Sequence, residues 1–76
     1  MSTLTAEQKK LLVLFKSAIK REQEAQEAYS EALLLSDAPV IRRIIETFIR
    51  QEKQHEETLL RMYNDLRTTG EFKDAT

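Results

Sequence analysis

The chain has no cysteine, no tryptophan, one glycine and one proline among its 76 residues. Without cysteine it can form neither disulfides nor thiolate metal sites. Its 12 basic and 13 acidic residues leave a net charge of −1, which gives no electrostatic reason to bind nucleic acid or an anionic membrane. The longest apolar run, Leu11–Phe15, is too short to span a bilayer or to form a secretory signal. We therefore expect a soluble, cytoplasmic protein.

What is present is a sequence rich in strong helix formers. A chain this short makes one domain at most, and such a domain buries a small share of its surface. Thr5 and Gln8 fit a capping box, which predicts that a first helix begins there and covers about residues 6–36. No strong helix breaker interrupts that stretch, in which Ala, Leu, Glu, Gln and Lys dominate.

The only proline marks the connection between two helices. Residues 36–39 predict a tight turn, in which Asp37 can cap the next helix and Pro39 suits its first turn. The second helix is predicted over about residues 39–69, and residues 70–76 carry no periodicity, as expected for a loose tail. So short a turn makes the helices antiparallel, and the predicted fold is an all-α two-helix hairpin.

Each predicted helix carries an apolar stripe with steps of three and four residues, as in helical bundles. The first stripe is Leu11, Phe15, Ala18, Glu22, Ala25, Tyr29 and Ala32. The second is Ile41, Ile45, Phe48, Glu52, His55, Leu59, Met62 and Leu66. Polar residues interrupt both stripes, at Glu22 and at the E-x-x-H pair Glu52 and His55. A buried carboxylate without a partner costs several kcal/mol, and a metal ion is the leading candidate to offset that cost.

The turn also predicts the height of these three residues along the hairpin. Residues whose numbers sum to about 75 should lie side by side in a hairpin centred between Asp37 and Ala38. Glu22 then lies opposite Lys53, level with Glu52 and within a turn of His55. Carboxylate oxygen and imidazole nitrogen suit iron, with manganese and zinc as alternatives.

One hairpin supplies too few side chains to enclose two metal ions. Two hairpins together supply four carboxylates and two imidazoles, and the charge of −4 matches two divalent ions. We therefore expect a homodimer, forming a four-helix bundle that holds two ions at its interface. Di-iron carboxylate bundles have this arrangement, with one Glu from each of two helices and Glu-x-x-His from each of the others.

The segment from Glu22 to Tyr29, with Glu seven residues before Tyr, resembles the first ligand helix of the rubrerythrin and ferritin-like families. The pair Glu52 and His55 resembles their E-x-x-H helix. The single copy of each motif, 30 residues apart, is more similar to the encapsulated ferritins, which are half-length ferritin-like proteins. The resemblance covers roughly residues 8–67.

The resemblance implies a ferroxidase that oxidises Fe(II) with dioxygen or peroxide and takes part in iron storage or detoxification. It also implies assembly into rings inside an encapsulin shell. Two features depart from the families. Residues 68–76 lack the small and apolar composition of an encapsulin targeting peptide, and the absence of cysteine excludes the cysteine-ligated iron domain of rubrerythrins within this chain.

Three further residues are candidates for secondary roles. Tyr29 lies two turns from Glu22 on the same face, where it could hydrogen-bond a ligand carboxylate across the bundle or serve as a core residue. Glu24 and Glu56 could flank the site as positions where metal ions first enter or rest transiently. Surface charge is the competing interpretation of both residues.

The apolar residues predict assembly beyond a dimer. Leu11–Phe15 runs right round its helix, and a second broad surface comprises Ile41, Ile44, Ile45, Phe48 and Ile49. A four-helix dimer leaves part of both exposed, and large apolar patches usually mark interfaces. Two other functions remain open: a non-catalytic helical-hairpin oligomerisation module, and a rubrerythrin-like di-metal protein that reduces peroxide.

Overall fold

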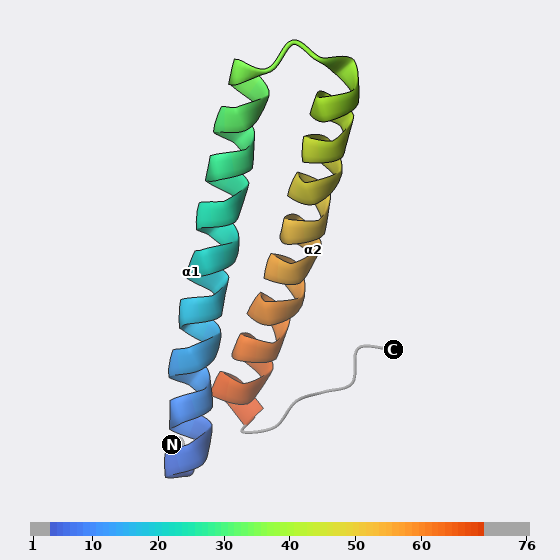
Figure 1. Ribbon diagram of the computed structural model, residues 1–76. Helices are drawn as coiled ribbons and strands as arrows, with labels where there is room; N and C mark the ends of the chain where they lie inside the picture. The colour runs from blue at the N-terminus through green and yellow to red at the C-terminus, as the bar shows by residue number, and fades with distance from the viewer. Residues whose placement is uncertain (1–3, 70–76) are drawn as a thin grey trace.

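The protein is a hairpin of two antiparallel α-helices, as predicted (Figure 1). The computed structural model describes residues 4–69, of which α1 comprises Ala6–Leu35 and α2 comprises Pro39–Thr69. The described residues contain no strand, so the all-α fold class is confirmed. The tail predicted over residues 70–76 lies outside the described part of the chain.

The predicted capping box is present at the start of α1. The Thr5 hydroxyl accepts a hydrogen bond from the Gln8 backbone N–H at 3.1 Å, and the Gln8 side-chain oxygen accepts one from the Thr5 N–H at 2.8 Å. Two of the N–H groups that a helix start leaves unpaired are satisfied in this way. These bonds explain why α1 begins at Ala6.

The turn differs from the expectation that Asp37 caps α2. Ala38 directly precedes the first helical residue, and its N–H donates to the Ser36 hydroxyl at 3.3 Å. The end of α1 is closed by Arg42, whose guanidinium donates to the carbonyls of Leu33 and of Ser36. A cation suits this position because the last carbonyls of a helix carry partial negative charge. Arg42 therefore ties the start of α2 to the end of α1.

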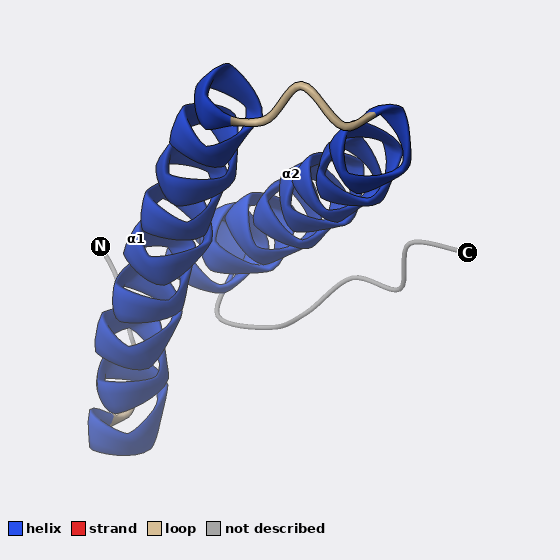
Figure 2. Cartoon of the chain, turned by 45° about the horizontal axis from the view of Figure 1, so that its top comes forward, coloured by secondary structure: helices blue, strands red, loops and turns tan. Residues whose placement is uncertain are grey.

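The hairpin by itself has a very small core. In the described part of the chain only Ile19 and Leu66 are buried, at 8% and 2% exposure. Within residues 4–69, α1 and α2 have only each other to pack against, as the tilted view in Figure 2 shows. Near the turn, the rings of Tyr29 and Phe48 pack with their centroids 5.4 Å apart. Two helices alone therefore cover only a narrow strip of each other.

Many large apolar side chains consequently remain exposed on the hairpin. They are Leu11, Val13, Leu14, Leu34, Leu35, Val40, Ile41, Ile44, Phe48 and Leu60. Ile41, Ile44 and Phe48 precede His55 by 14, 11 and 7 residues, close to whole numbers of helical turns, so they share its side of α2. Neither α1 nor α2 has the apolar stretch needed to cross a bilayer.

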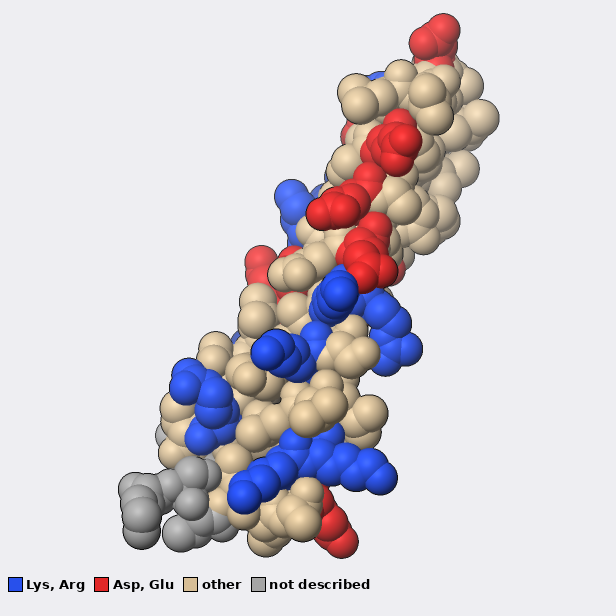
Figure 3. Space-filling view, turned by 90° about the vertical axis from the view of Figure 1, so that its left-hand side faces the viewer, with Lys and Arg blue, Asp and Glu red and all other residues tan. Residues whose placement is uncertain are grey.

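The outer face of α1 is divided by charge (Figure 3). Lys and Arg are concentrated between residues 9 and 21, and Glu between residues 22 and 31. An antiparallel neighbour with the same sequence would set the basic half of one α1 near the acidic half of the other.

Candidate metal centre

The structure brings together the three residues predicted as metal ligands. We call Glu22 of α1 and Glu52 and His55 of α2 the cluster. Each offers one ligand atom, and these atoms all lie within 4.8 Å of one another. His55 Nδ1 lies 3.6 Å from Glu22 Oε2 and 4.0 Å from Glu52 Oε2. Atoms this close can bind a common ion, and whether they do so stays a prediction.

Two simple features of the sequence produce the cluster. Glu52 and His55 are three residues apart on a helix, which places them on one face a turn apart. The turn at residues 36–38 then sets the height of Glu22. The pairs Glu22–His55 and Tyr29–Phe48 both have residue numbers that sum to 77, close to the value expected from the turn centre.

The burial of the cluster is uneven. The side chains of Glu22 and Glu52 are 22% and 21% exposed, whereas that of His55 is 61% exposed. Glu22 Oε2 is buried and has no hydrogen-bond partner, since the 3.6 Å separation from His55 is too long for a hydrogen bond. A buried carboxylate oxygen without a donor is costly. A metal cation would satisfy this oxygen, and the carboxylate and imidazole donors fit iron, manganese or zinc.

Tyr29 takes part in packing within the hairpin. Its half-buried ring is tilted by 45° against Phe48. In the described part of the chain its hydroxyl has no hydrogen-bond partner, so a bond to a ligand carboxylate of the same hairpin is not made. A bond across a bundle to a second subunit stays a prediction.

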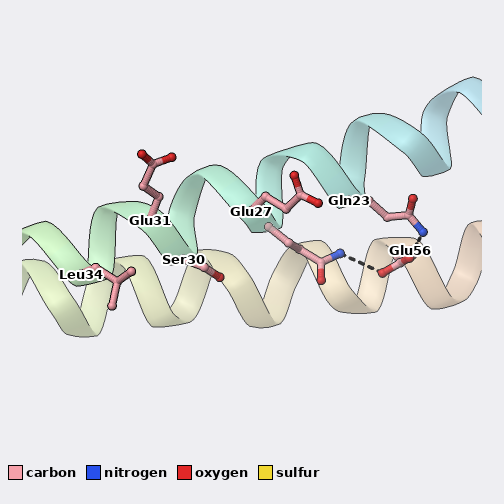
Figure 4. A pocket seen from close by; sticks show the side chains of 7 residues that line it. Gln23, Glu27, Ser30, Glu31, Leu34 and Glu56 are labelled. Atoms are coloured by element: carbon pink, nitrogen blue, oxygen red, sulfur yellow. Dashed lines mark hydrogen bonds between the residues drawn. The ribbon is translucent and has the colours of Figure 1, made fainter.

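Glu24 and Glu56, predicted to flank the site, have different surroundings. Glu24 is exposed on α1. Glu56 accepts hydrogen bonds from the side-chain amides of Gln23 at 2.7 Å and Gln26 at 2.8 Å (Figure 4). These two bonds, with that of Gln26 the stronger influence, lower the pKa of the Glu56 carboxyl below its usual 4.5, and Lys53 adds a smaller effect. A metal role for either glutamate stays a prediction.

We call Gln23, Gln26 and Glu56 the clamp. The clamp borders an open cavity that is lined by Gln23, Gln26, Glu27, Ser30, Glu31, Leu34 and Glu56 (Figure 4). The sequence offered a signal for the clamp that the stripes alone do not reveal: two glutamines three residues apart, beside Glu22, at the height of a polar residue on the other helix.

The fold and the cluster together define a class of protein. An antiparallel hairpin with Glu on one helix and E-x-x-H on the other is half of a ferritin-like di-iron bundle. A sequence model of the family described as Rubrerythrin matches residues 13–76. The chain therefore belongs to the rubrerythrin family of ferritin-like di-iron proteins, whose domains bind iron. No curated protein and no solved structure gives a significant match.

Proposed function

We propose that the protein is a ferroxidase, in which two copies of the hairpin enclose Fe(II) as substrate and release it as Fe(III) for storage or detoxification. Glu22, Glu52 and His55 of each copy bind the iron. Two Fe(II) ions supply two electrons, which with two protons reduce dioxygen to hydrogen peroxide, or reduce peroxide to water.

The buried, unpartnered oxygen of Glu22 is the observation that carries the proposal. Among the side-chain nitrogen and oxygen atoms of the described residues, Glu22 Oε2 is the one that is buried without a hydrogen-bond partner. It lies 3.6 Å from His55 Nδ1, a second atom that could bind the same ion. A group this costly persists where another component of the functional protein completes it.

A second copy of the chain completes the cluster on its open side. The 61% exposure of His55 leaves that side unprotected in a single hairpin. The exposed side chains of Ile41, Ile44 and Phe48 continue the same side of α2 toward the turn. Burial of these side chains between two hairpins is favourable. It also brings two clusters together, so that four carboxylates balance two divalent ions.

The residues have separate tasks in this proposal. The carboxylates of Glu22 and Glu52 favour the more highly charged Fe(III) over Fe(II), because negative ligands stabilise the greater positive charge. His55 binds as the neutral imidazole, and the apolar residues around the interface limit access of water. Iron is the substrate, and the chain contributes binding, charge and exclusion of solvent.

The proposal extends to assembly beyond the dimer. Exposed apolar side chains also occur away from the His55 side, at Val13, Leu34 and Leu35 among others. These exposed side chains support further association of dimers. An encapsulin shell around the assembly follows from the family resemblance and from no contact in the hairpin. Measurement of solution mass, followed by co-expression with an encapsulin, tests both points.

Anaerobic addition of Fe(II) followed by air tests the enzyme, with oxidation recorded as absorbance in the near ultraviolet. We expect faster oxidation than in buffer, abolished in Glu52→Ala and kept in Glu57→Ala, an exposed neighbour on α2 outside the cluster. Oxidation at the buffer rate by the unmodified protein would instead favour an oligomerisation module. A response to peroxide but not to air would favour peroxide reduction.

A further inference from the structure

The clamp joins the helices at the level of the cluster. Its three side chains come from both helices: Gln23 and Gln26 lie on α1, and Glu56 lies on α2. Both carboxylate oxygens of Glu56 are used, since Oε2 accepts from Gln23 at 2.7 Å and Oε1 accepts from Gln26 at 2.8 Å. These two hydrogen bonds join α1 and α2 well away from the turn, where Arg42 makes further hydrogen bonds between the helices.

The clamp residues are the sequence neighbours of the cluster. Gln23 follows Glu22 and Glu56 follows His55. Successive residues of an α-helix differ by about 100° in direction, so the Glu22–His55 contact and the Gln23–Glu56 contact lie on opposite edges of the line where the helices meet. The cluster and the clamp therefore lie on the two edges of the helix interface at one height.

Without metal, no hydrogen bond between Glu22 Oε2 and its neighbours in the described helices fixes the geometry of the cluster. Its two carboxylates repel each other, and Glu22 Oε2 has no donor to hold it. Apolar contacts between the helices are not directional, so they permit sliding and rotation. Hydrogen bonds to a carboxylate are short, directional and stronger than neutral ones. The clamp is thus the interaction at this height that can fix both the register and the rotation of the helices.

We propose that Glu56, held by Gln23 and Gln26, is a positioning residue that keeps Glu22, Glu52 and His55 in metal-binding geometry. This inference rests on the proposed metal site. In this role Glu56 acts through its hydrogen bonds to Gln23 and Gln26, one on each carboxylate oxygen. Removal of groups that orient metal ligands typically weakens metal binding by about 10–100-fold.

Cobalt(II) is a suitable probe, because its visible absorption reports the geometry of its ligands without any turnover. We would titrate the unmodified protein, Glu56→Ala and Glu57→Ala with cobalt(II). Glu57 is exposed and is neither in the cluster nor in the clamp. We expect Glu56→Ala to bind about 10–100-fold more weakly, with an altered spectrum, and Glu57→Ala to match the unmodified protein.

Two further variants separate positioning from general stability. Arg42→Ala removes the hydrogen bonds at the turn, far from the cluster, and should lower stability without changing the cobalt spectrum. The double variant Gln26→Glu with Glu56→Gln reverses donor and acceptor, and should recover most of the lost affinity. If Glu56→Ala does not fold, Gln23→Ala retains the Gln26 bond and should give a smaller loss of the same kind.

The outcomes distinguish this inference from the proposed function. Failure of the unmodified protein to bind cobalt(II) would remove the metal site and the positioning role together. Normal binding by the unmodified protein, with equal affinity and spectrum in Glu56→Ala, would overturn the positioning role alone. Urea unfolding of each metal-free variant provides the stability scale. If Arg42→Ala, at equal loss of stability, changes affinity and spectrum as much as Glu56→Ala does, the positioning role is likewise overturned.

Discussion

The two edges of the helix pair differ in the hydrogen bonding of their glutamate side chains. On one edge, Glu22 has a buried oxygen without a donor, beside an exposed His55. On the other edge, one step along each helix, Glu56 has a donor for both oxygens. We call the Glu56 edge the closed edge, because the chain itself supplies a hydrogen-bond donor to both carboxylate oxygens. We call the edge with Glu22 and His55 the open edge. On the open edge a single hairpin leaves Glu22 Oε2 without a partner, and we therefore propose this edge as the place where metal and a second copy of the chain bind.

The exposed apolar side chains also distinguish the open edge from the closed edge. Ile41, Ile44 and Phe48 are exposed on the His55 side of α2, while only Ile19 and Leu66 are buried in the described part of the hairpin. A pair of helices with so small a core gains most from burying the edge that is both apolar and unsatisfied. Packing and charge thus favour the same edge for association.

The largest expected effect comes from changing the open edge at its centre. Glu22→Ala should weaken metal binding by at least about 100-fold and abolish metal-dependent association, because it removes two of the four carboxylates of the dimer. The free energy of unfolding without metal should not fall, since the substitution removes a buried oxygen that has no partner. Isothermal titration and urea unfolding measure the two quantities. Glu24→Ala, exposed on the same helix, should leave both unchanged.

A lysine on the apolar part of the open edge should have the next largest effect. Ile44 is 48% exposed on the His55 side of α2, and Leu60 is 40% exposed one turn beyond Glu56 on the other side. Ile44→Lys should weaken dimerisation at least about tenfold, because two like charges would be buried at the interface. Sedimentation velocity would measure the change, with Leu60→Lys as the matched control. Equal loss in both variants would contradict the assignment of the interface to one edge.

The smallest expected effect is the pH dependence of the closed edge. The pKa of Glu56 is lower in the folded protein than its usual 4.5, so its contribution to stability is present above that value. The contribution is lost as the pH falls below 4.5 through the folded pKa, because protonation removes the acceptor charge. Urea unfolding between pH 6 and pH 3 should show the gap between the unmodified protein and Glu56→Gln narrowing. A gap that widens toward acid pH would be inconsistent with the lowered pKa.

Periodicity and turn length were enough to predict that Glu22, Glu52 and His55 lie together. Steps of three and four residues determine the face of Glu22, Glu52 and His55, and the short turn determines their height. Neither argument uses side-chain detail, which is why both succeeded. The capping box at Thr5 was predictable for the same reason, since it depends on residues three apart along one helix.

The closed edge was not predicted, because it depends on rotation and reach. Glu56 contacts Gln23 and Gln26 and does not join the cluster, because neighbouring residues of a helix point about 100° apart. Residue numbering across the turn predicts only the height of a residue along the hairpin, so it could not predict this difference in direction. The turn shows the same limit. Asp37 had the right residue type for a cap, but Ala38 directly precedes the first residue of α2. The long reach of Arg42 to the carbonyls of Leu33 and Ser36 was also not predictable from local residue type.

Each chain supplies one Glu22, one Glu52 and one His55 to the proposed dimeric centre. A substitution at any of these residues would therefore occur twice in that centre. If intact and ligand-deficient chains were made in equal amounts and paired at random, only about one quarter of the dimers would contain two intact clusters. In the proposed dimer, loss of one ligand residue would therefore behave as a dominant defect in a mixed population.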